Sequence, residues 1–376
     1  MIKISDKFDS GNISVLAASD PMDIRLEIKK DRNSDFFQWF HFQVQAKSFQ
    51  ELKMKITNVS KSAYVPGWED YKVVASYDRK EWFRIPGTTF NGSELTIEHT
   101  MEHDSMFFAY FAPYSFERHL DLLSTSQMDK RCELIQLGET LDGRDISLLK
   151  IGEDDPSKKK VWMIARQHPG ESMAEWFVEG FLERLLDGNE SLALKALEHA
   201  VFYIVPNMNP DGAFRGHLRT NANGANLNRE WQTPTLENSP EVFHVRAKMD
   251  EVGVDIFLDI HGDENLPYNF LAGSEGNLSY TDEIKRLEDM FKESFLETSP
   301  DFQTEFGYDI DEKGEGNMTV ACNAIGDRFN CLSYTLEMPF KDNANLPNVK
   351  YGWSDQRSKV LGRDILNPIF TVLKNL

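Results

Sequence analysis

Four apolar strands alternate with helical stretches after about residue 125, and this alternation constrains the fold more than any other feature. The predicted strands are "KKVWMIARQ", "HAVFYIVP", "VDIFLDIHG" and "LSYTLEMPF". Helical patterns lie at 172–188, at 239–253 and at 357–376, where Pro368 is expected to kink or break the last helix. Strands that alternate with helices predict an α/β sheet that is covered by helices on both faces.

The first 125 residues carry a different pattern. In "FHFQVQ", Phe40, Phe42 and Val44 point to one side and the polar residues between them to the other, which is the period of a half-buried strand. Similar runs recur in "LKMKITNV", "YKVVASYD", "LTIEHTM" and "SMFFAYFAPY". We therefore predict an antiparallel β-sandwich domain over 1–125 and an α/β domain over 126–376, packed together because no Gly/Ser linker separates them.

Composition and charge narrow the class of protein. The chain is 40% hydrophobic and 27% charged, which is typical of a soluble globular protein, and no apolar run approaches a membrane span. A net charge of −20 disfavours nucleic acid and anionic membranes as partners. The N-terminus lacks a signal-peptide pattern, so we expect a cytoplasmic protein. Cys132, Cys322 and Cys331 are expected to be free buried thiols.

Polar residues stand at the ends of three of the predicted strands. His168 and Glu171 follow the first strand, His261 follows the third, and Glu337 lies near the end of the fourth. Because ligands of α/β sheets bind beyond the carboxyl ends of the strands, these side chains are expected to converge. Two histidines and a carboxylate are the ligand set of a catalytic zinc site. Glu337, in an otherwise apolar strand, is either a general base or one half of a buried ion pair.

The segment "NMNPDGAFRGHLRTNANGANLNREW" is rich in Asn, Gly and Arg and reads as a loop. Arg219, Asn228 and Arg229 suit a substrate carboxylate or a developing oxyanion, because guanidinium binds carboxylate through two donors and Asn adds a neutral one. Asn221 and Asn223 fit equally well as loop residues that bond their own backbone, and they are assigned no role.

Five motifs, "HPGE", "NPDG", "NLNREW", "DIHGDE" and "YTLEMPF", occur in this order and resemble those of the zinc carboxypeptidases. The pieces "QWFHFQV", "PYSFERHLDLL" and "LDGRDISLLKIG" are similar to the cytosolic carboxypeptidase branch, which has a β-sandwich ahead of its catalytic domain. The resemblance covers nearly the whole chain. It implies a mixed central sheet with helices on both faces, the zinc carboxypeptidase fold.

The resemblance also implies a role for each candidate residue. His168, Glu171 and His261 would bind one zinc ion, and Glu337 would be the general base that activates the zinc-bound water. Arg219 would stabilise the tetrahedral oxyanion. The substrate would be a peptide or protein C-terminus, whose free carboxylate Asn228 and Arg229 would hold.

Three departures from the wider family bear on specificity. Asn226 stands where many members have an Asp that orients a zinc-bound histidine, and its amide oxygen can accept the same hydrogen bond. Gly170 stands where digestive members have an Arg. Tyr308 is the candidate for the mobile tyrosine of those members, and Arg328 is a nearby cation that could reach the substrate. The preferred C-terminal residue stays open, although the negative charge disfavours polyglutamate.

Three functions remain open from the sequence. The first is a zinc metallocarboxypeptidase, the second an amidohydrolase that acts on N-acylated amino acids on the same fold, and the third a catalytically silent interaction protein. The complete set of ligands with Glu337 disfavours the third. The large N-terminal part favours the first over the second.

Overall fold

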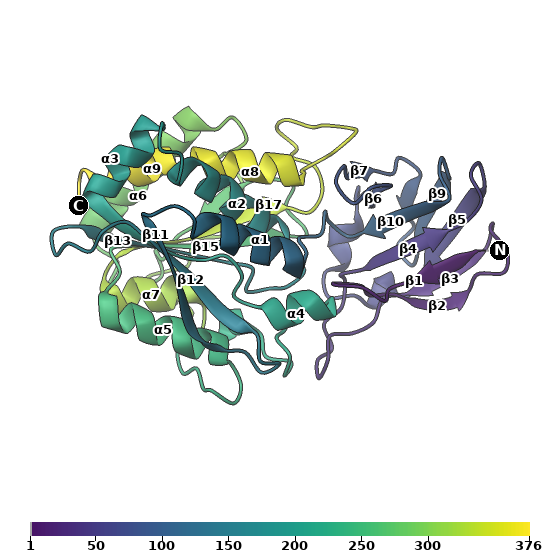
Figure 1. Ribbon diagram of the computed structural model, residues 1–376, viewed down its shortest axis with the longest axis horizontal. Helices are drawn as coiled ribbons and strands as arrows, with labels where there is room; N and C mark the ends of the chain where they lie inside the picture. Colours follow the sequence, from purple (N-terminus) through teal and green to yellow (C-terminus); the bar gives the residue numbers. More distant parts are fainter. Residues whose placement is uncertain (1) are drawn as a thin grey trace.

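Two five-stranded sheets build the N-terminal part of the chain, which the computed structural model describes over residues 2–376 (Figure 1). Their strand orders are β1-β4-β10-β6-β7 and β2-β3-β5-β9-β8. All pairs are antiparallel except β3 with β5, so the predicted antiparallel sandwich is confirmed with one parallel pair. The strands are β1 (Lys3–Ser5), β2 (Ser14–Ala17), β3 (Ile24–Glu27), β4 (His41–Gln45), β5 (Glu51–Ile56), β6 (Val74–Ser76), β7 (Phe83–Arg84), β8 (Thr88–Phe90), β9 (Leu95–Thr100) and β10 (Ser105–Ala109).

The C-terminal part is built on a seven-stranded sheet of order β11-β12-β14-β13-β15-β17-β16. Strand β13 runs parallel to β14 and β15, and β15 runs parallel to β17, while the outer pairs are antiparallel. The predicted mixed sheet is therefore confirmed. Its strands are β11 (Cys132–Glu139), β12 (Asp145–Ile151), β13 (Lys159–Ala165), β14 (Ala200–Val205), β15 (Ile256–Asp263), β16 (Phe270–Ala272) and β17 (Leu332–Pro339).

Helices cover both faces of this sheet (Figure 1). Neighbouring side chains of β13 point to opposite faces, so Met163 enters the core under α2 and α8 whereas Trp162 enters the core under α5 and α7. No helix within residues 2–376 is both long and apolar enough to cross a bilayer. The helices are α1 (Phe116–Ser126), α2 (Met173–Leu185), α3 (Ser191–His199), α4 (Pro210–Arg215), α5 (Pro240–Val252), α6 (Asp282–Thr298), α7 (Ala321–Phe329), α8 (Asp355–Asp364) and α9 (Leu366–Leu373), with short 3-10 turns η1 (Val59–Lys61), η2 (Val65–Trp68) and η3 (Leu227–Arg229).

The last helical stretch is broken, as its proline predicts. The chain leaves α8 at Asp364 and starts α9 at Leu366, two residues before Pro368. A proline ring clashes with the carbonyl four residues earlier, which here belongs to Asp364, and its missing N–H costs nothing in the first turn of a helix. The three cysteines are buried and free, also as expected.

A buried arginine joins the two parts of the molecule. Arg84 of β7 has no carboxylate partner within the described residues 2–376, and its guanidinium donates at 2.7–3.2 Å to five backbone carbonyl oxygens. Four of them belong to the segment that follows β17. The acceptors are the carbonyls of Lys72, Phe340, Lys341, Tyr351 and Trp353.

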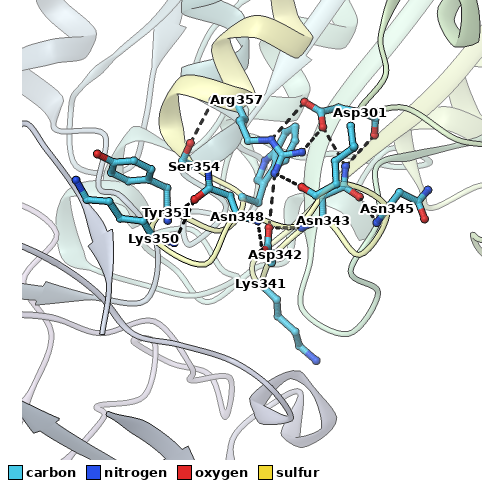
Figure 2. Close-up of polar contacts among 12 residues, drawn as sticks. Asp301, Lys341, Asp342, Asn343, Asn345, Asn348, Lys350, Tyr351, Ser354 and Arg357 are labelled. Atoms are coloured by element: carbon cyan, nitrogen blue, oxygen red, sulfur yellow. Dashed lines mark hydrogen bonds and ion pairs between the residues drawn. The ribbon is translucent and has the colours of Figure 1, made fainter. Parts of the chain in front are cut away.

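The segment 340–354, which supplies four of the carbonyls that Arg84 contacts, is itself held in place by polar contacts (Figure 2). Asp301 accepts from Asn343 Nδ2 at 3.1 Å and pairs with the guanidinium of Arg357 on α8. Arg357 also donates to the carbonyl of Leu346 at 2.9 Å. The connection between β17 and α8 therefore presents fixed carbonyls to the N-terminal part.

Candidate metal centre

One cavity of about 670 Å³ lies at the edge of the central sheet where β13, β15 and β17 end. It brings together most of the candidate residues, although they are separated by up to 169 positions between His168 and Glu337. Its walls also include two tyrosines, one from each part of the chain. The lining residues that bear on chemistry are Tyr64, His168, Glu171, Arg219, Asn228, Arg229, Glu264, Glu275, Tyr308 and Glu337.

A buried arginine stabilises the turn that follows β13. Arg166 has a left-handed backbone at φ +58°, and its guanidinium donates to the carbonyls of Pro169 at 3.0 Å and Tyr114 at 2.9 Å. It also pairs with Glu175 of α2, which is fully buried. Sequence reasoning assigned neither residue a role. Together they fix the turn that carries His168.

His168, Glu171 and His261 form a buried cluster whose ligand atoms all lie within 4.8 Å of one another. The carboxylate of Glu171 lies between the two imidazoles, with Oε1 2.6 Å from Nδ1 of His168 and Oε2 2.8 Å from Nδ1 of His261. The two Nδ1 atoms are 3.2 Å apart. Two imidazole nitrogens and a carboxylate that converge in this way fit the donor preference of zinc.

The outer nitrogen of each histidine has its own partner. Nε2 of His168 lies 3.1 Å from the amide oxygen of Asn226, so the Asn that replaces the usual Asp makes the contact expected of it. Nε2 of His261 lies 2.7 Å from Oδ2 of Asp259. Asp259 was missed from the sequence, although an acid two residues before His261 in an apolar strand points to the same face. Such outer partners orient metal-binding imidazoles.

The charges around the cluster favour a cation at its centre. Burial, with the nearby charge of Arg219, lowers the pKa of His168 to about 4, which leaves its imidazole neutral and able to bind metal. Burial opposes ionisation of His261, but Asp259 and Glu171 on either side outweigh it and raise its pKa well above the ordinary value. A divalent cation supplies the positive charge that these carboxylates attract.

Glu337 lies beside the cluster, because β17 pairs in register with β15 and places Glu337 opposite His261. One carboxylate oxygen lies 3.2 Å from the Tyr308 hydroxyl, whose single hydrogen it shares with Asp263, the closer acceptor at 2.7 Å. The other oxygen is buried and has no hydrogen-bond partner among residues 2–376. Burial, reinforced by the charge of Glu171, raises the pKa of Glu337 well above its ordinary value.

Three donors face the cavity from the long loop. The guanidinium of Arg219 lies near the rings of Phe36 and Tyr64, 5.7 and 5.5 Å from their centroids. Asn228 accepts from the backbone N–H of Ala321 at 2.8 Å through its amide oxygen, which turns its NH₂ group away from that contact. Arg229 lines the same cavity and donates to the carbonyl of Asn228 at 2.6 Å.

Two further candidates from the sequence have different outcomes. Tyr308 does reach the cavity, where it touches Glu337. Arg328 does not line it and instead forms an exposed ion pair with Asp250 of α5. A side chain at Gly170 would begin 3.0 Å from the carbonyl of Leu218, so this position is crowded by the loop.

An α/β sheet that ends in a buried two-histidine, one-carboxylate cluster, beside a glutamate with one oxygen that no group within residues 2–376 binds, defines a metal-dependent hydrolase. Known proteins that resemble this chain narrow the class of hydrolase to one family. Residues 4–111 match the model of the cytosolic carboxypeptidase N-terminal domain, and residues 117–353 match that of the zinc carboxypeptidases. The chain belongs to the zinc carboxypeptidase family, and it is accordingly a hydrolase of the exopeptidase class.

Three relatives resemble the chain over nearly its whole length. An uncharacterised protein of Zymomonas mobilis is 48% identical over 97% of this chain and 95% of its own length. A metallo-carboxypeptidase from Burkholderia cenocepacia is 48% identical, with a TM-score of 0.97 over 100% of both chains. A metallo-carboxypeptidase from Pseudomonas aeruginosa, solved in complex with (2-guanidinoethylmercapto)succinic acid, is 46% identical, with a TM-score of 0.97 over 99% of both chains.

Proposed function

We propose that this chain removes the C-terminal residue from peptides or protein tails with the help of one zinc ion. His168, Glu171 and His261 would hold the ion, and their convergence in a buried cluster within 4.8 Å is the observation that carries the proposal. When bound, zinc supplies a Lewis acid that makes water a usable nucleophile near neutral pH.

Glu337 is proposed as the general base. Its partnerless buried oxygen is available to accept a proton from the attacking water and then to deliver that proton to the leaving amine. Burial and Glu171 raise the pKa of Glu337, and the positive charge of a cation held by the neighbouring cluster would oppose this shift and favour the ionised form that accepts a proton. The neighbouring Tyr308 hydroxyl steadies the other oxygen.

The cationic loop explains why the proposed activity is confined to chain ends. Asn228 and Arg229 would bind the free α-carboxylate, which only the last residue of a peptide possesses. Arg219 would donate to the oxygen of the scissile carbonyl as negative charge develops there. Binding the chain end therefore orients the bond that is to be cut.

Substitution of Glu337 by Gln tests this assignment. The amide keeps the shape of the side chain but cannot take a proton, so peptide cleavage should fall by about three orders of magnitude or more while bound zinc stays at one per chain. Glu312→Gln, which changes an exposed residue outside the cavity, serves as the matched control. A Glu337→Gln enzyme with one zinc and full activity would refute the role of the base.

An acidic wall residue of the cavity suggests which side chain the enzyme accepts. Glu275 lines the cavity together with Thr335 and Ala272, which pair across β16 and β17. Lys292 is 3.6 Å from Glu275 but pairs more closely with Glu288, so two carboxylates share one ammonium. Burial and the neighbouring Glu288 raise the pKa of Glu275 to about 7.

An incoming ammonium or guanidinium group would stabilise the ionised form of Glu275, whereas an acidic side chain would be repelled. The ligand of the Pseudomonas aeruginosa relative, named for its guanidino and succinic acid groups, agrees with a site for a cationic side chain near an acid. We therefore propose a preference for peptides that end in Lys or Arg.

The division of the chain is also proposed. We place the sandwich domain at 1–125 and the catalytic domain at 126–376, with α1 as the helix that connects them, since His119 of α1 lies 2.8 Å from Glu175 of α2. The match to a cytosolic carboxypeptidase N-terminal domain supports a cytoplasmic location, which cell fractionation with an antibody to this chain would test.

A further inference from the structure

The loop that carries Arg219 rests on the N-terminal sandwich. Ser10 N donates to the carbonyl of Phe214 at 2.9 Å, and Asn12 Nδ2 donates to the carbonyl of Gly216 at 2.8 Å. Gly216 has a φ of +70°, and a side chain there would begin 2.7 Å from the carbonyl oxygen of Ser10. The two parts are therefore in direct backbone contact at the start of this loop.

Asp31, from the turn between β3 and β4, binds the backbone on both sides of Arg219. Its Oδ1 accepts from Leu218 N at 2.7 Å, and its Oδ2 accepts from Arg219 N at 2.8 Å and Thr220 N at 2.9 Å. The Thr220 hydroxyl adds a fourth hydrogen bond at 3.1 Å. Asp31 is only 3% exposed, so these charge-assisted bonds form away from water.

The next residue along the sandwich extends this contact. The backbone N–H of Arg32 donates to Nε2 of His217 at 3.1 Å, and Nδ1 of His217 lies 3.0 Å from the carbonyl of Thr220. Nε2 must therefore be the acceptor and Nδ1 the protonated donor. His217 braces the loop from within and takes no part in the cluster around His168.

The side chain of Arg219 is held by the sandwich as well. Phe36 and Tyr64 place their rings near its guanidinium, at centroid distances of 5.7 and 5.5 Å. Tyr64 is itself fixed by Gln38, whose amide accepts from Tyr64 N at 2.8 Å and donates to Tyr64 O at 3.1 Å. Both the backbone and the guanidinium of Arg219 are thus positioned by residues of the other domain.

We propose that Asp31 is a positioning residue for catalysis, through which the N-terminal sandwich completes the active site of the other domain. The inference rests on the proposed function, because it takes Arg219 to stabilise the oxyanion. Asp31 does not line the cavity and acts through the 218–220 backbone and the Thr220 hydroxyl. A shift of the Arg219 donor by about 1 Å is enough to lower a rate by about a hundredfold.

Asp31→Asn is the direct perturbation, because the new NH₂ group would face N–H donors that it cannot satisfy. Its kcat is expected to fall by about 10- to 100-fold with KM within about threefold, since the lost interaction belongs to the transition state. Asp35→Asn is the matched control: Asp35 lies in the same turn, is exposed, and forms an ion pair with Lys30 at 2.6 Å.

A double-mutant cycle with Arg219→Gln separates positioning from a general loss of structure. If Asp31 acts through Arg219, Asp31→Asn should cost less than about threefold once Arg219 has been replaced. Additive losses would overturn the proposal. So would a kcat for Asp31→Asn equal to that of the wild type on peptides that the wild type cleaves.

Amide hydrogen exchange tests the contact independently of activity. In Asp31→Asn, exchange at residues 217–221 should become faster, and Asp35→Asn should leave it unchanged. Unchanged exchange in Asp31→Asn would overturn the proposal, whether or not the wild type cleaves peptides. A wild type that cleaves no peptide would instead contradict the proposed function. If Asp31→Asn does not fold, Phe36→Leu replaces it as the test variant. Removing the ring near the Arg219 guanidinium is expected to lower kcat about fivefold. An unchanged kcat in Phe36→Leu would overturn the proposal.

Discussion

Replacement of Arg84 by Met should strongly weaken the junction between the sandwich and the catalytic domain. The variant keeps much of the aliphatic volume and removes all five donated hydrogen bonds. Arg84 is buried and no carboxylate within residues 2–376 forms an ion pair with it, so its contribution is made mainly through backbone carbonyls and nearby rings. The predicted effect can therefore be worked out from those contacts.

Of the five carbonyls, that of Lys341 also accepts the N–H of Trp353 at 3.0 Å and keeps one partner. Each of the other four carbonyls loses its guanidinium donor, which costs about 1 kcal/mol of unfolding free energy. The ring centroids of Tyr71 and Phe111 lie 5.8 and 5.9 Å from Arg84 Cζ, and losing these contacts adds about 1 kcal/mol to the cost. Because Met also removes the penalty of burying a cation, part of this cost is offset. The expected loss is about 3–5 kcal/mol, a large part of the stability of a typical protein.

Urea unfolding of the purified zinc-loaded protein measures this loss. We expect a lower midpoint, and a transition that broadens or splits because the two domains no longer unfold together. Arg25→Met, at an exposed arginine of the same sandwich paired with Asp23, should change the unfolding free energy by less than about 1 kcal/mol. If Arg84→Met matches this control, the reasoning about the junction is wrong.

The remaining predictions concern charge and metal. Glu275→Gln should lower kcat/KM about tenfold for a peptide ending in Lys and leave its Leu-ending twin unchanged. In the wild type, the Lys-to-Leu ratio of kcat/KM should rise from pH 6 to pH 8, because the pKa of Glu275 is raised to about 7 and the carboxyl ionises over that range; a flat ratio would exclude this carboxylate from selectivity. Burial raises the pKa of Glu241 to about 8. The folded protein therefore keeps a proton that the unfolded chain releases near pH 4.5, and the free energy of unfolding falls as the pH rises between these two values. Glu241→Gln should therefore be more stable than the wild type at pH 9 and nearly equal to it at pH 4 by urea unfolding, and equal stabilities at pH 9 would contradict the assignment. Chelation of zinc should lower the thermal midpoint of the wild type but not that of His261→Ala, in which the cluster lacks one donor; a similar shift in both would place the metal elsewhere.

The sequence predicted the gathering of His168, Glu171, His261 and Glu337 because each stands at the end of a buried strand. Parallel strands end at one edge of a sheet, so strand periodicity alone brings distant residues together. Asn226 was also recognised, from its place in a motif. These predictions depend only on local patterns in the amino-acid sequence.

Asp31, Phe36 and Tyr64 could not be found in this way. Asp31 lies almost 190 residues before the loop that it binds, in a turn whose composition is ordinary. Nothing in the periodicity of the sandwich shows which of its turns faces the catalytic domain. Arg84 is hidden for the same reason, since its partners are backbone carbonyls and these carry no signature in a sequence.

The central claim is that this chain is a carboxypeptidase, and a pair of otherwise identical peptides tests it most directly. One peptide ends in Lys with a free carboxylate and the other in Lys amide, and each is incubated with the zinc-loaded protein and followed by mass spectrometry. Because Asn228 and Arg229 are proposed to bind the free carboxylate, we predict that only the first peptide is shortened, one residue at a time from its C-terminus. Equal cleavage of both peptides, cleavage at an internal bond, or no shortening of any free-ended peptide would contradict the account.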